Sequence, residues 1–127
     1  MQTSLVTPYI FSALVVILAA NAGLTESVGA HPFWAISVAW IGVPIGLVLA
    51  LATKTLGVAW LFRVLVFLIC VVAAYALAAV GKERFAASYA EDRLAGQMWY
   101  FGWIALISSA TALIAALFSP TRTRSEA

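Results

Sequence analysis

Charged residues are scarce in this sequence. Only 9% of its 127 residues are Asp, Glu, Lys or Arg, whereas 65% are hydrophobic; an average soluble domain has about 25% charged residues. A chain this short buries only about two-thirds of its surface when it folds in water. The excess apolar surface therefore predicts an integral membrane protein. The seven basic residues are scattered along the chain and form no basic patch, so we expect no nucleic-acid partner.

The sequence also has few of the side chains that carry chemistry in a membrane. Cys70 is the single cysteine, which excludes an intramolecular disulfide. The long apolar stretches contain no Asp, Glu, Lys or His, and Arg63 is their one charged residue. Proton relays and haem or metal ligation use carboxylates and histidines. We therefore expect no metal, no cofactor, no catalytic residue and no enzymatic activity.

Four apolar stretches are each long enough to cross a bilayer. A hydrocarbon layer about 30 Å thick needs about 20 helical residues, and uniformly apolar runs lack the alternation of a membrane barrel. The sequence predicts an all-α, polytopic membrane protein, a four-transmembrane-helix bundle that forms a single membrane domain over residues 1–127. A disordered tail is expected at 120–127. The predicted spans are about 5–24, 32–53, 57–80 and 98–119.

Proline and glycine suggest where these spans begin and end. Pro8 is expected in the first turn of the first helix, where its missing N–H costs nothing. Gly23 is expected to end that helix, and Gly81 the third. The polar, alanine-rich segment 81–97 either prolongs the third helix beyond the membrane or lies at the interface as a helix of its own.

Small residues share one face of the second span and one face of the fourth. With 100° per residue, Gly42 and Gly46 lie together on the second, and Gly102 and Ser109 on the fourth. Small side chains let helices approach closely in lipid. These four residues are therefore predicted to pack the helices of one bundle, with a dimer seam through either span as the alternative. Pro44, between the two glycines, is expected to kink the second helix.

Arg63 is the first candidate for contact with a ligand or partner. It aligns with Cys70 and Ala74 on the third span, so we expect it to face protein. Its planar guanidinium suits a lipid phosphate, a quinone carbonyl or a carboxylate of another subunit. The alternative is that it snorkels to the nearby headgroups. Cys70 is expected to be buried and therefore inert.

Aromatic residues supply the other contact candidates. His31 precedes the second span, where it is either an interfacial belt residue or a ligand. Trp99 and Trp103 are expected in an aromatic belt at the membrane surface. The bulky faces of the helices are predicted to meet lipid or a partner through Trp40, Trp103, Phe67 and Phe118.

The distribution of basic residues gives the expected orientation. With four spans, four basic residues lie on the side of both termini and three on the other side. Because Lys and Arg are enriched on the cytoplasmic side, we expect both termini in the cytoplasm, with a bacterial inner membrane as the location. The four are Lys54, Arg63, Arg122 and Arg124, and the three are Lys82, Arg84 and Arg93.

These observations favour a small non-catalytic protein that acts through its neighbours. The first hypothesis is an accessory or assembly subunit of a larger membrane complex, with membrane lipids and other membrane subunits, or further copies of itself, as partners. The alternative is a homo-oligomeric channel or carrier for a small solute or lipid, although no polar face lines a path. A lipid- or quinone-directed enzyme is the second alternative, and it lacks an acid–base pair.

Overall fold

The computed structural model describes residues 2–120, and within that range all regular structure is helical. The predicted all-α class is therefore confirmed. Three helices, α3, α4 and α5, are long and apolar enough to cross a membrane, and Leu5–Asn21 forms a shorter apolar helix. These helices fit an integral membrane protein. The predicted tail lies, from residue 121 on, outside the described residues. The helices are α1 (Gln2–Asn21), α2 (Leu24–Val28), α3 (Ser37–Thr55), α4 (Trp60–Ala87) and α5 (Arg93–Leu117).

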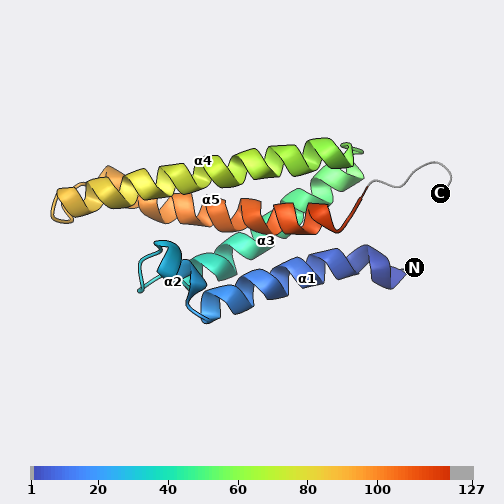
Figure 1. The fold of residues 1–127 in the computed structure, drawn as a ribbon, viewed down its shortest axis with the longest axis horizontal. Helices are drawn as coiled ribbons and strands as arrows, with labels where there is room; N and C mark the ends of the chain where they lie inside the picture. Colours follow the sequence, from blue (N-terminus) through green and yellow to red (C-terminus); the bar gives the residue numbers. More distant parts are fainter. Residues whose placement is uncertain (1, 121–127) are drawn as a thin grey trace.

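The four longer helices run alternately in opposite directions (Figure 1). α5 is the central helix, because it packs against α4, α3 and α1. α4 lies along α5 and packs mainly on it, which leaves much of the α4 surface uncovered. We call the end where α5 stops and α4 starts the Arg63 end. The opposite end, where α4 turns into α5, is the Trp99 end.

Local sequence explains how the helices are separated. Gly23 follows α1 with a φ of 92°, and Gly57 lies between α3 and α4 with a φ of 81°. Both are in the left-handed region that glycine enters without a steric penalty. The side-chain amide of Asn21 donates to the Ile17 carbonyl at 2.9 Å, which satisfies an acceptor in the last turn of α1. At the start of α5, Asp92 caps the helix by accepting from the backbone N–H of Ala95.

The predicted end of the third helix at Gly81 is wrong, because α4 continues to Ala87. A Cβ at Gly81 would lie 2.5 Å from the backbone nitrogen of Trp99 and 2.7 Å from the carbonyl oxygen of Ala95. The glycine therefore lets α4 and α5 approach closely and does not end the helix. Of the two alternatives for segment 81–97, the structure shows the one that prolongs the helix, and α5 already begins at Arg93.

Two helix starts also differ from expectation. α1 begins at Gln2, so Pro8 lies inside the helix and not in its first turn. α3 begins at Ser37, five residues after the predicted start at 32. The residues before it form turns, in which the backbone N–H of Trp34 donates to the His31 carbonyl at 3.1 Å. The short helix α2 precedes these turns, and the sequence patterns did not indicate it.

The small-residue faces of α3 and α5 pack within the chain itself. A Cβ at Gly42 would lie 2.7 Å from the Ile107 side chain of α5, and one at Gly46 would meet the Ser108 carbonyl oxygen. A Cβ at Gly102 would lie 2.9 Å from the backbone of α4. The three glycines thus sit at the α3–α5 and α4–α5 contacts, where small residues let membrane helices approach closely.

Two of the four bulky residues expected at the surface are buried. Trp103 is 4% exposed and Phe67 is 5% exposed, whereas Trp40 and Phe118 are exposed as predicted. The reason is the central position of α5. Because α5 has neighbours on several sides, Trp103 on its bulky face is covered as well as the small residues on its other face. Phe67 of α4 packs in the cluster that includes the alanines near the end of α5.

Candidate functional site

An aromatic cluster lies at the Trp99 end. The indole N–H of Trp99 donates to the Gly29 carbonyl at 2.9 Å, which attaches α5 to the loop after α2. The Trp99 ring also contacts the rings of His31, Trp34 and Phe85, with centroid distances of 5.4, 5.2 and 5.9 Å. A buried tryptophan packs through its apolar ring and needs an acceptor for its N–H, and this cluster supplies both.

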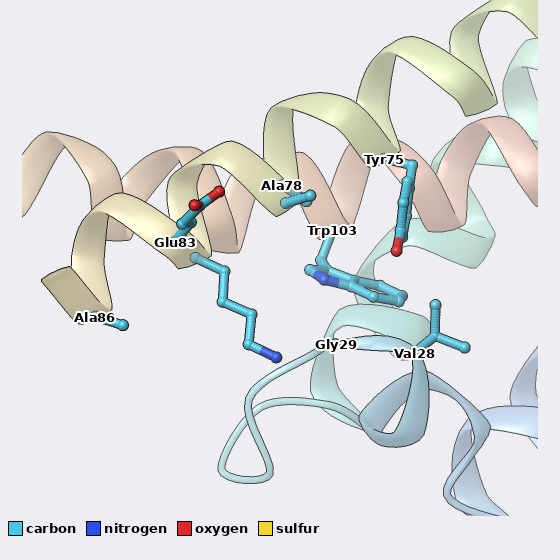
Figure 2. A pocket seen from close by; sticks show the side chains of 9 residues that line it. Val28, Gly29, Tyr75, Ala78, Glu83, Ala86 and Trp103 are labelled. Atoms are coloured by element: carbon cyan, nitrogen blue, oxygen red, sulfur yellow. The ribbon is translucent and has the colours of Figure 1, made fainter.

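Of the predicted contact residues, His31 and Trp99 come together in this cluster, whereas Trp103 does not. The His31 side chain is exposed, and its Nδ1 accepts from the backbone N–H of Phe33 at 3.0 Å. This hydrogen bond fixes how the ring lies against Trp99. Trp103 follows one turn deeper and lines a pocket of about 280 Å³ between α4 and α2 (Figure 2). Its side chain is buried in the protein, and its place in an aromatic belt stays a prediction.

Arg63 lies at the other end, where the structure places it inside the protein. It is 1% exposed. Its Nη2 donates to the Ser119 carbonyl at 2.9 Å, and its Nε donates to the Val58 carbonyl at 3.1 Å. The guanidinium thus faces protein acceptors, as its helical face predicts, and snorkelling to the headgroups does not describe it. A contact between Arg63 and a lipid or partner subunit stays a prediction.

Two further side chains join Arg63 at the end of α5. The indole N–H of Trp60 donates to the Ala116 carbonyl at 2.7 Å, and Lys54 Nζ donates to Ser119 Oγ at 2.6 Å. The last carbonyls of a helix have no partner within it and carry partial negative charge. Cations and an indole donor therefore stabilise this terminus. The sequence contains a signal for this arrangement, because basic residues lie on both sides of the α3–α4 turn. It does not show which helix these residues cap.

Hydroxyl groups in α5 are directed mainly into their own helix. Ser108 Oγ donates to the Ile104 carbonyl and Ser109 Oγ to the Ala105 carbonyl, each at 2.7 Å. These bonds match the role expected for membrane serines. Thr111 differs from that expectation, since its buried hydroxyl has no hydrogen-bond partner among the described residues. It packs instead where α3 passes α5.

A lateral groove of about 710 Å³ opens between α3, α4 and α5, near the middle of the bundle. We call it the α3/α4/α5 groove. Several of its residues are small, and Cys70 lies on its wall. Cys70 is exposed, so its predicted burial is wrong. Arg63, which was expected on the same face of the helix, lies seven residues earlier on α4 and is buried. The groove is lined by Ile45, Leu49, Val66, Phe67, Cys70, Ala73, Ala74, Leu77, Phe101, Ile104, Ala105, Ser108 and Ser109.

Chemistry-bearing groups do not converge in the part of the chain that the structure describes. Over residues 2–120, no three His, Cys, Asp or Glu side chains gather in a way that could hold a metal ion. No family model, no curated protein and no solved structure matches the chain. Functional inference therefore starts from the groove, the pocket beside Trp103 and the two polar ends.

Proposed function

We propose that this chain is a non-catalytic accessory or assembly subunit that holds a transmembrane helix of a partner subunit in the α3/α4/α5 groove. The observation that carries the proposal is the groove itself, an apolar hollow on the lateral face of the bundle. Its floor and walls include Ala73, Ala74, Ala105 and Ser109, whose short side chains leave space for another helix.

Packing physics supports a helix in this groove. Lipid tails are as apolar as leucine, so helices associate in a membrane through close contact and not through escape from water. Close contact requires small residues on at least one partner. Ser108 and Ser109 already bond their own helix carbonyls, so a partner can cover them without leaving a hydroxyl unsatisfied.

A second groove provides a useful contrast. It lies between α1 and α3, has a volume of about 600 Å³ and contains no small residue. Flexible acyl chains can fill such an irregular surface, whereas a helix backbone cannot approach it closely. The proposal therefore assigns the partner helix to the α3/α4/α5 groove. The α1/α3 groove is lined by Leu5, Val6, Tyr9, Ile10, Leu47, Val48 and Leu51.

The proposal includes a four-span arrangement. α1 has 20 residues, which at 1.5 Å per residue gives about 30 Å, the thickness of a bilayer core. It runs antiparallel to both α3 and α5, the two long helices that it packs against (Figure 1), as an up-and-down bundle requires. We place the chain in a bacterial inner membrane with both termini in the cytoplasm, on the charge distribution given above.

Cys70 provides the test, because it is the only cysteine in the chain and lies in the groove wall. Native membranes are treated with a bifunctional maleimide–benzophenone reagent and irradiated, and the cross-linked products are identified by mass spectrometry. We expect one protein other than this chain, cross-linked in a fixed ratio to it. The matched control is Cys70→Ser combined with Val72→Cys, which moves the thiol to an exposed position of α4 outside the groove.

Three outcomes would contradict the proposal. Equal capture from positions 70 and 72 would show contact by random collision in the membrane. Capture of a second copy of this chain alone would favour the homo-oligomeric alternative. Reproducible turnover or ion flux by the purified protein in liposomes would show that it acts without a partner.

A further inference from the structure

The pocket beside Trp103 has an amphipathic lining that the proposed function does not use. It lies on the side of α4 that faces α2, away from the α3/α4/α5 groove, and α4 and α2 do not pack closely there. In Figure 2 the side chains of Tyr75 and Trp103 converge on its interior, and Val28 and Gly29 form the opposite wall. Alanines of α4 complete the lining and leave the space open.

Lys82 supplies a cation at one end of this pocket. Its ammonium lies 6.0 Å from the centre of the Trp99 ring and 3.8 Å from the position that a Cβ would take at Gly29. The ammonium is thus held between the aromatic cluster and the loop after α2. Glu83 also borders the pocket, but its carboxylate is directed away from Gly29 (Figure 2).

The depth of these groups matches the layers of a membrane surface. Lys82 lies beside Trp99, at the polar end of the bundle. Tyr75 is seven residues earlier on α4, which corresponds to about 10 Å along a helix. A molecule in the pocket would therefore meet a positive charge at headgroup level and aromatic and alkyl surface farther into the hydrocarbon. Basic pockets beside membrane helices bind anionic lipid headgroups in this way.

We propose that the pocket between α2 and α4 binds an anionic phospholipid, with its phosphate on the Lys82 ammonium and the start of an acyl chain against Trp103 and Tyr75. This inference goes beyond the proposed function, because the site lies on another face of α4 and does not depend on a partner subunit. It also assigns a role to the loop that Trp99 holds in place through the Gly29 carbonyl.

Native mass spectrometry of the delipidated full-length protein in detergent can test the site. Phosphatidylglycerol, phosphatidylcholine and inorganic phosphate are titrated separately. We expect one tightly bound phosphatidylglycerol, and about fivefold weaker binding in Lys82→Gln, because one basic residue at an anionic lipid surface contributes a factor of this size. Arg84→Gln is the matched control, since Arg84 is a cation on the same helix that does not line the pocket.

A second pair of variants tests the apolar half and remains informative if Lys82→Gln fails to fold. Ala79→Phe places a ring in the pocket, whereas Ala76→Phe places the same ring on an exposed part of α4 outside it. We expect lipid binding to be lost only in the first. Equal binding by Lys82→Gln and Arg84→Gln would overturn the proposal. So would equal affinity for phosphatidylcholine, or binding of inorganic phosphate as tight as that of the lipid.

Discussion

Replacing Gly46 with alanine should separate the two helices at the centre of the bundle. The new Cβ would lie 2.7 Å from Thr111 Cβ and would also meet the Ser108 carbonyl oxygen. Carbon atoms pack best at about 3.5–4.0 Å, so α3 and α5 would have to move apart by about 1 Å. The carbonyl belongs to the backbone of α5 and cannot rotate away.

The expected magnitude follows from two opposing effects. Overpacking a tight contact costs about 1–3 kcal/mol, and an immovable backbone neighbour favours the upper part of that range. Alanine recovers up to about 1 kcal/mol as a better helix former than glycine. We therefore expect Gly46→Ala to lower the free energy of unfolding by about 2 kcal/mol.

The assay is reversible unfolding of the detergent-solubilised protein with sodium dodecyl sulfate, followed by circular dichroism. Gly96→Ala is the control. Its Cβ would lie 3.0 Å from carbons of the Phe85 ring, and this half-buried side chain can shift. Gly96→Ala should therefore be close to neutral or slightly stabilising. A Gly46→Ala protein as stable as wild type or as Gly96→Ala would refute the close α3–α5 contact.

Two further predictions concern the Arg63 end and the topology. Arg63→Leu removes the donors to the Ser119 and Val58 carbonyls and should lower the free energy of unfolding by about 2–3 kcal/mol, measured by the same titration; unchanged stability would mean that these bonds contribute nothing to the fold. Reporter fusions after Glu126 should report the cytoplasm and fusions within Glu83–Arg93 the exterior, and the opposite pattern would show that the charge distribution does not set the orientation.

The sequence by itself determined the class of structure. Apolar stretches of about 20 residues with one charge among them require helices in lipid, because no other local structure satisfies its own backbone groups there. Gly23 separates helices in the structure as well as in the pattern. Arg63 was identified in the same way, since a guanidinium within an apolar helix needs acceptors from protein or headgroups.

Only the tertiary structure decided which apolar face is inside. In water, hydrophobicity separates core from surface, but in lipid the two are equally apolar, so the burial of Trp103 and Phe67 and the exposure of Cys70 could not be read from composition. The same holds for Gly81, where the pattern predicted a helix end and the approach of α5 explains the glycine. The candidate sites depend on the same information, because the α3/α4/α5 groove and the Lys82 pocket lie between helices distant in the chain. Which helices become neighbours is decided by the packing of side chains from all of them together, and no single helix carries that information.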